Sequence, residues 1–193
     1  MFYKLVVMDI DGTIRTPEKP VSSRLIRAIE HLLDVENVIV TIATGRTHQS
    51  TVNAIKELDI KAPIIVHQGT RIVDPNTNTG IWHKPMTEIM VLEAIDALKS
   101  WQGEIMAYCD KEIYTNKLTP WVKSYGNRNH IDIKLVRDLK QIGNNGILRV
   151  VAVGKDNDVI RLIRGMKNML FLRQNMKKVL LKIDQNTILT SVI

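Results

Sequence analysis

Residues 4–14 read KLVVMDIDGTI, and the architecture of the chain follows from this stretch. An apolar, β-branched run at residues 5–8 stops abruptly at two acids, Asp9 and Asp11, and Gly12 comes next. This pattern predicts a buried strand that runs into a turn. In open α/β sheets, ligands bind just beyond the carboxyl ends of the strands. We therefore expect a site where this strand ends.

The two acids are spaced so that they can work together. In an extended chain, Asp9 and Asp11 project to the same side. Two carboxylates this close resist joint ionisation, and either a divalent cation between them or a proton on one of them relieves the conflict. Both arrangements suit chemistry on phosphate. The alternative is a polar turn in which Gly12 takes a positive φ; the apolar strand directly before the acids favours the functional interpretation.

Apolar runs and amphipathic stretches alternate through the first part of the chain. We predict a helix over residues 24–33, a second buried strand that opens after Asn37, a helix over residues 47–58 and a strand over residues 63–66. The order strand, helix, strand, helix, strand predicts an α/β fold with a parallel sheet and right-handed crossovers.

A hydroxyl follows the second strand. Thr44 stands where that strand gives way to a helix, so it can donate to a phosphoryl oxygen, and the Gly45 amide and the helix dipole add to this. The alternative role for Thr44 is a helix N-cap with no ligand.

These motifs resemble those of a known family. The DxDGT motif, Asp9 to Thr13, resembles the first motif of the haloacid dehalogenase-like (HAD) superfamily of phosphohydrolases, and TGR at residues 44–46 resembles the second motif of its Cof-like, type IIB branch. The resemblance implies a Rossmann-like core and hydrolysis of small phosphorylated metabolites such as sugar phosphates. In such an enzyme Asp9 is the nucleophile, Asp11 is the general acid and base, and both residues hold Mg²⁺.

The resemblance also implies which residues surround the substrate. The expected phosphate-binding residues are Thr44, Gly45, Gly12 and Thr13. Candidate substrate-binding residues are Arg46, Gln68 and Gly69, the last two from a QGT sequence that stands where the family has Asn-Gly-Ala.

The pattern changes from Trp82 onward. Residues 81–173 resemble the C2-type cap of the Cof-like branch, an α+β insertion that covers the active site and carries substrate selectivity. The predicted order of domains is an incomplete core over residues 1–80, the cap over residues 81–173, and a basic tail or vestigial return to the core over residues 174–193. Within the cap we predict a helix over 87–101, a strand pair around a turn at Asp110-Lys111, a helix from Pro120, a strand over 147–153 and a helix over 156–169.

Two motifs of the family have no match here. These are a lysine that steadies the nucleophile and an acidic GDxxND motif that completes the Mg²⁺ shell; the nearest candidate, residues 179–186, lacks the glycine before Asp184. We therefore expect a truncated core with weakened Mg²⁺ binding and an exposed edge at the first strand, or completion by a separate chain. The alternative function is an inactive binding module that docks a partner through this edge.

Composition sets further limits. With 193 residues, 45% hydrophobic and 24% charged, the chain is globular, and no apolar run is long enough to span a membrane. A single cysteine, Cys109, allows no internal disulfide and favours a cytoplasmic location. The five histidines show no metal-ligand spacing.

The net charge of +7 arises near the end of the sequence, where seven basic residues after residue 158 face one acid. The rest is nearly balanced, so nucleic acid is not an expected partner, whereas a homo-oligomer is allowed. For residues 159–182 we favour a solvated, charged segment over a basic helix for nucleic acid or membranes.

Overall fold

The computed structural model of residues 1–193 describes residues 3–16, 20–143, 145–154, 180–184 and 187–192. The chain divides into two compact units, Met1–Lys84 and Pro85–Ile193, and each is described by itself. The predicted boundaries at residues 80 and 173 stay predictions. Among the described helices, none combines the length and the apolar composition that crossing a membrane requires.

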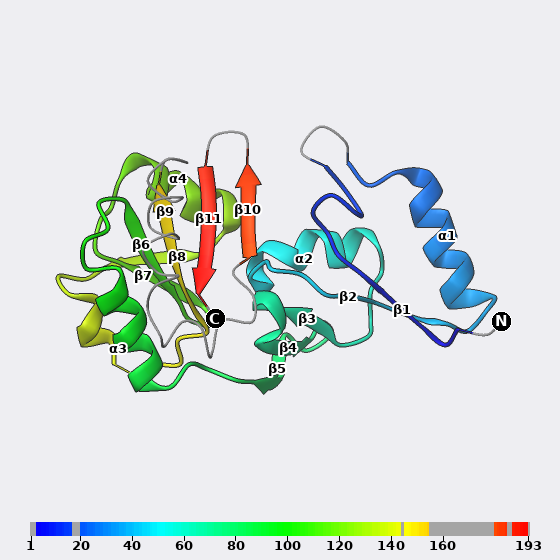
Figure 1. Ribbon diagram of the computed structural model, residues 1–193. Helices are drawn as coiled ribbons and strands as arrows, with labels where there is room; N and C mark the ends of the chain where they lie inside the picture. Colours follow the sequence, from blue (N-terminus) through cyan, green and yellow to red (C-terminus); the bar gives the residue numbers. More distant parts are fainter. Residues whose placement is uncertain (1–2, 17–19, 144, 155–179, 185–186, 193) are drawn as a thin grey trace. The chain divides into compact units, whose positions relative to one another are not determined.

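The first unit begins with a β-α-β arrangement. Strand β1, Leu5–Met8, pairs in parallel with β2, Ile39–Ile42, and the helix α1, Ser23–Asp34, connects them (Figure 1). The side chain of Ser22 caps α1 by accepting a hydrogen bond from the Leu25 amide at 3.2 Å. This arrangement confirms the predicted parallel pairing.

The first unit then adds a helix and an antiparallel meander. Helix α2, His48–Glu57, leads to β3, Ile64–Val66, which joins the parallel strands through one bridge between Ala43 and Ile65. A 3₁₀ turn at residues 67–69 follows. Strands β4, Arg71–Asp74, and β5, Thr79–His83, then extend β3 in antiparallel order. The first unit therefore combines a parallel pair of strands with a three-stranded antiparallel sheet, linked by that bridge.

One hydrophobic core holds the first unit together. The face of the β1–β2 pair that carries Val6 and Met8 packs with the apolar side of α1. Full burial of each such aliphatic side chain contributes about 1.5–3 kcal/mol. The side chains buried most completely in this cluster are Ile10, Ile29, Val40, Ile42, Ala54, Ile64, Val66 and Val73.

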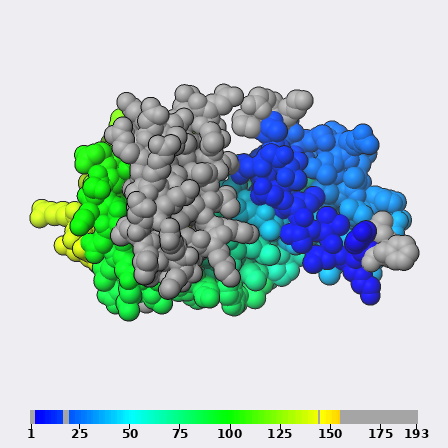
Figure 2. Space-filling view, viewed as in Figure 1, coloured from blue at the N-terminus to red at the C-terminus, as the bar shows by residue number. Residues whose placement is uncertain are grey.

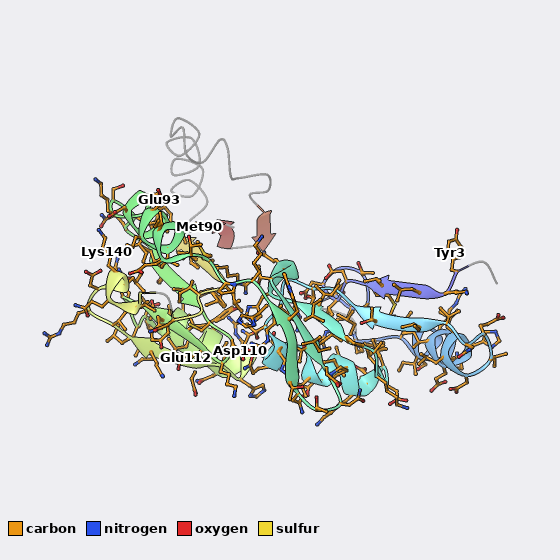
Figure 3. The ribbon with its side chains drawn as sticks, turned by 90° about the horizontal axis from the view of Figure 1, so that it is seen from below. Tyr3, Met90, Glu93, Asp110, Glu112 and Lys140 are labelled. Atoms are coloured by element: carbon orange, nitrogen blue, oxygen red, sulfur yellow. The ribbon has the colours of Figure 1, made fainter. Side chains whose placement is uncertain are left out.

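The first strand is half buried, in contrast to the fully buried strand that its composition predicts. The side chains of Leu5 and Val7 are 53% and 47% exposed, and they alternate with Val6 and Met8, which pack against the core. Figure 2 shows this part of the chain, in dark blue, at the surface, and in Figure 3 the side chain of Tyr3 projects away from the ribbon. The hydrophobic cluster of this unit includes Val6 and Met8 on one face of the strand, whereas Leu5 and Val7 point to the opposite face and belong to none of the clusters of the described residues.

The second unit is built on a six-stranded sheet in the order β10-β11-β9-β6-β7-β8. The predicted hairpin is confirmed: β6 and β7 are antiparallel, Asp110 lies in their connection, and Glu112 is the first residue of β7 (Figure 3). Strand β8 was not predicted, because its alternating apolar and charged residues stand in a polar interval. The elements are α3 (Glu88–Ala97), β6 (Glu104–Tyr108), β7 (Glu112–Thr115), α4 (Pro120–Asn129), β8 (Asp132–Leu135), a 3₁₀ turn (Leu139–Ile142), β9 (Arg149–Gly154), β10 (Leu180–Asp184) and β11 (Thr187–Val192).

The last part of the second unit is described only in part. The predicted helix over residues 156–169 lies outside the described residues. Strands β10 and β11 form an antiparallel pair, and β11 pairs with β9 (Figure 1). The basic tail or return to the core expected for residues 174–193 stays a prediction.

The sheet of the second unit is covered on both faces. Ile105 and Ala107 of β6 belong to a cluster that includes α3, whereas Met106 and Tyr108 belong to one that includes Val122 of α4. Because successive residues of a strand point to opposite faces, both faces are apolar. This double burial explains why the central strands are continuous hydrophobic runs.

Candidate active site

The candidate site lies where β1 and β2 end. The register of the pair continues past β1, because the Ala43 amide donates to the Met8 carbonyl at 2.9 Å. The residues that follow each strand therefore start from the same edge of the sheet. Both sequence motifs are placed at this edge.

The DxDGT segment forms a closed turn. The carbonyl of the fully buried Ile10 accepts hydrogen bonds from the amides of Ile14 and Arg15, both at 3.1 Å. Gly12 has φ +79°, a conformation that L-residues rarely adopt, and its amide donates to the Arg15 carbonyl at 2.9 Å. The buried Ile10 thus anchors a turn from which Asp9 and Asp11 reach outward.

Asp11 is joined directly to the second motif. The Arg46 guanidinium donates from Nε to Asp11 Oδ2 at 2.9 Å and from Nη2 to Asp11 Oδ1 at 2.7 Å. Both side chains are about 30% exposed. Such a two-point pair between arginine and a carboxylate fixes the geometry more tightly than a single contact does.

Thr44 does not cap the next helix. The cap of α2 is Thr47, whose Oγ1 accepts from the Ser50 amide at 3.3 Å. The buried Thr44 instead accepts a hydrogen bond from the Arg46 amide at 3.2 Å. In this contact the hydroxyl is an acceptor, so its own proton can still be donated to a ligand.

The 3₁₀ turn after β3 packs against the same segment. The His67 amide donates to the Arg46 carbonyl at 2.8 Å, and the Gln68 amide donates to the Thr44 carbonyl at 3.1 Å. A Cβ atom on Gly45 would lie 3.2 Å from Cγ of Gln68, so the Gln68 side chain lies over this glycine. The structure therefore brings residues 44–46 and Gln68 together.

The remaining predicted residues are placed by the turn itself. Asp9 is exposed directly after β1. Thr13 is also exposed, and the Gly12 amide is used by Arg15. Gly69 has φ +93° and completes the turn after Gln68. Their assigned roles at a phosphate remain predictions.

The residues suit Mg²⁺ in kind. Magnesium prefers oxygen ligands, and the Asp9 carboxylate and the main-chain carbonyl of Asp11 are of this type. Among the described residues, however, no three His, Cys, Asp or Glu side chains gather closely enough to hold a metal ion. An ion at this turn would take its other ligands from water and substrate.

Sequence reasoning missed one feature of the site. It placed Arg46 near the substrate, but it did not predict the pairing of Arg46 with Asp11. The two residues are 35 positions apart, and only the parallel register of β1 and β2 brings them together. The signal for this ion pair in the sequence was that an acid, Asp11, follows one strand and a base, Arg46, follows the next.

Fold and site together define a hydrolase of the haloacid dehalogenase-like class. A known haloacid dehalogenase-like hydrolase structure from Bacteroides thetaiotaomicron matches 97% of this chain and 70% of its own, with a TM-score of 0.71 and 21% identity. The family model described as haloacid dehalogenase-like hydrolase matches residues 6–185. The chain belongs to this family.

Two curated relatives are named phosphatases. The 5-amino-6-(5-phospho-D-ribitylamino)uracil phosphatase of Bacillus subtilis is 23% identical over 157 residues, which are 80% of this chain and 57% of the relative. The pyridoxal phosphate phosphatase of Escherichia coli is 27% identical over 110 residues, 57% of this chain and 40% of the relative. The match thus spans little more than half the length of the Bacillus subtilis relative and less than half the length of the Escherichia coli relative.

Proposed function

We propose that this protein is a phosphatase that hydrolyses small phosphomonoesters, with Mg²⁺ and through an aspartyl-phosphate on Asp9. One observation carries the proposal: the ion pair between Asp11 and Arg46 joins the two acids of the first motif to the Thr44-Gly45-Arg46 motif. The names of the relatives support the substrate class, since both act on small phosphorylated compounds.

The proposed reaction has two halves. In the first, a carboxylate oxygen of Asp9 forms a bond to phosphorus, the bond to the ester oxygen breaks, and Asp11 gives its proton to that oxygen. In the second, a water oxygen attacks the phosphorus and its proton passes to Asp11. The bond to Asp9 then breaks, and inorganic phosphate leaves.

The residues of the second motif would stabilise the charge that develops on the phosphoryl group. The Thr44 hydroxyl and the Gly45 amide are hydrogen-bond donors at the N-terminal side of α2, where the helix dipole also favours an anion. When bound by Asp9 and the Asp11 carbonyl, Mg²⁺ would neutralise part of the phosphate charge. In this proposal Gln68, which lies beside Gly45, contributes to binding of the substrate.

Residues 81–173 are proposed to act as the cap. In this proposal residues 81–173 cover the substrate and select its leaving group, and residues 1–80 supply the chemistry. A cytoplasmic location agrees with the single cysteine, Cys109, which is buried as a free thiol. The proposed partner is the small phosphorylated substrate.

The test uses the purified chain with p-nitrophenyl phosphate and Mg²⁺. Asp9→Asn removes the nucleophile and should lower kcat at least about 10³-fold. Asp59→Asn is the matched control, because Asp59 is an exposed acid of the same unit that pairs with Lys61, and it should leave the rate unchanged. Phosphate release that survives Asp9→Asn would contradict the assignment of the nucleophile.

A second candidate function rests on a different observation. Leu5 and Val7 expose apolar surface on β1, whose second edge has no strand partner among the described residues, and such an edge is a site for strand addition by another chain, either a second copy or one that completes the core. This alternative predicts association that depends on concentration, with no turnover. Sedimentation of the wild type and of Val7→Lys tests this alternative, since the lysine should abolish association; a wild type that stays monomeric at all concentrations, or that turns over p-nitrophenyl phosphate, would contradict it.

A further inference from the structure

We propose that Arg46 is a positioning residue for Asp11, rather than a substrate-binding residue. In this role its guanidinium fixes the plane of the carboxylate that exchanges a proton with the leaving oxygen. The inference rests on the proposed function and assigns a role in the proton-transfer step.

The two contacts define the orientation of the carboxylate. Each oxygen of Asp11 accepts one hydrogen bond from a different nitrogen of Arg46, at 2.7 and 2.9 Å. A carboxylate has about four lone-pair positions, so each oxygen retains another lone pair whose direction is now set. A proton carried there is delivered along a defined line, which is what general acid catalysis needs.

Arg46 is itself held in place. Its Nη1 donates to the Ser50 carbonyl in the first turn of α2 at 3.2 Å. Its main chain is fixed at both ends, because its amide donates to Thr44 Oγ1 and its carbonyl accepts from the His67 amide. The guanidinium is therefore attached to the scaffold independently of Asp11.

An exposed ion pair of the same unit, Lys61–Asp59, provides a comparison for the burial and geometry of the Arg46–Asp11 pair. Lys61 and Asp59 are more than 70% exposed and meet at one contact, whereas Arg46 and Asp11 are about 30% exposed and meet at two. Exposed single-contact pairs are weakly ordered, because solvent competes and both side chains lose freedom. The Arg46–Asp11 pair has the partial burial and the geometry of a fixed support.

Binding of the substrate phosphate by Arg46 is the competing role. The N–H groups on Nε, Nη1 and Nη2 that are described above all point to protein oxygens of Asp11 and Ser50. An arginine that binds phosphate would instead direct two parallel N–H groups of its guanidinium at the ligand. The two roles differ in which kinetic constant they change.

The test compares two substrates in wild type, Arg46→Gln and Arg46→Lys. p-Nitrophenyl phosphate has a good leaving group that needs little protonation, whereas glycerol phosphate has an alkoxide leaving group that depends on the acid. Loss of positioning should lower kcat about 10²-fold for glycerol phosphate and less than about 10-fold for p-nitrophenyl phosphate, with KM nearly unchanged. Arg46→Lys keeps the positive charge but cannot make the two parallel hydrogen bonds to Asp11, so it should restore little of the lost rate.

The opposite pattern would overturn the proposal. Equal losses for both substrates together with a raised KM would mean that Arg46 binds the phosphate. A double mutant sharpens this: in an Asp11→Asn background, Arg46→Gln should change kcat less than about 2-fold, because the residue to be positioned is gone. Independent effects would also overturn the proposal.

A measurement without turnover separates this inference from the proposed function. In NMR spectra, the Nε–H signal of Arg46 should shift in Asp11→Asn and stay in place in Asp59→Asn. If the chain shows no phosphatase activity but the signal behaves in this way, the proposed function fails and the pairing stands. If an active wild type shows no dependence on Asp11 in its Arg46 signal, the positioning role is wrong and the phosphatase remains.

Discussion

Strands β1 and β9 have similar β-branched, apolar sequences but opposite environments. Strand β9 lies between β11 and β6, and its residues from Arg149 to Val153 are at most 7% exposed. Strand β1 pairs with β2 alone among the described residues, and Leu5 and Val7 are about half exposed. The comparison teaches that apolar composition makes the strand, whereas the layers packed on its faces decide its burial: β9 has a hydrophobic cluster on each face, and β1 has one on the face of Val6 and Met8. The candidate site belongs to the less buried strand.

The largest expected effect comes from shortening one side chain in a buried strand of the second unit and one in the half-exposed strand β1. Met106→Ala in β6 removes a fully buried side chain that packs between the sheet and α4, and it should lower the free energy of unfolding by about 2–5 kcal/mol. Leu5→Ala in β1 removes a side chain that is 53% exposed and should cost well under half as much. Urea unfolding followed by circular dichroism measures both.

Equal losses in these two variants would contradict the comparison. They would mean that the exposed face of β1 is covered in solution. Measuring Leu5→Ala at two protein concentrations then tells whether a second copy provides the cover, since only association makes the midpoint depend on concentration.

Two glycines provide a smaller test, because they are needed for different reasons. Gly12 has φ +79° with open space around it, so Gly12→Ala should cost about 1–2 kcal/mol of backbone strain. Gly126 is in α4, and a Cβ there would lie 2.7 Å from Cγ1 of Ile133, so Gly126→Ala should cost about 1–3 kcal/mol through crowding, less the gain in helix propensity.

Asparagine separates the two causes. Asn tolerates a positive φ, so Gly12→Asn should be more stable than Gly12→Ala. Gly126→Asn adds further atoms to a filled space and should be less stable than Gly126→Ala. Thermal melting gives the order, and the same order at both positions would show that one mechanism governs them.

The smallest expected effect concerns the residues that follow β1 and β6. Asp9 is exposed, whereas Cys109 is buried, and burial raises the pKa of its thiol from 9.0 to about 11. The unfolded chain loses this proton first as pH rises, so the stabilisation is complete below pH 9 and is lost as the pH rises to about 11. Urea unfolding between pH 8 and 11 should show a shallower alkaline decline in Cys109→Ala than in wild type. Identical declines would contradict the burial of this thiol.

Much of the first unit was predictable, because local chemistry determines it. Ser22 caps a helix, apolar runs form β1, β2 and β3, and Gly12 marks a turn with positive φ. The prediction of a buried β1 was wrong, because apolar composition reports only that a strand can be buried. Strand β8, Asp132–Leu135, was missed because it is four residues long and stands in a polar interval, although its alternation of charged and apolar residues is itself a strand pattern.

The candidate site was predictable in its parts but not in its connections. The spacing of Asp9 and Asp11 and the position of Thr44 follow from where strands end. That Thr47 caps α2, and that Arg46 reaches Asp11, depends on side-chain geometry between segments remote in sequence. Such contacts arise only when the register of a sheet is known.

The close approach of Gln68 to Gly45 has a consequence for how such sequences diverge. A side chain at position 45 would strike the stem of residue 68, whose own backbone has φ +58° and tolerates few replacements. A side chain at position 45 is therefore expected to favour a shifted or smaller side chain at position 68, so we expect these two positions to vary together. A library randomised at both sites should recover compensated combinations that neither single library contains.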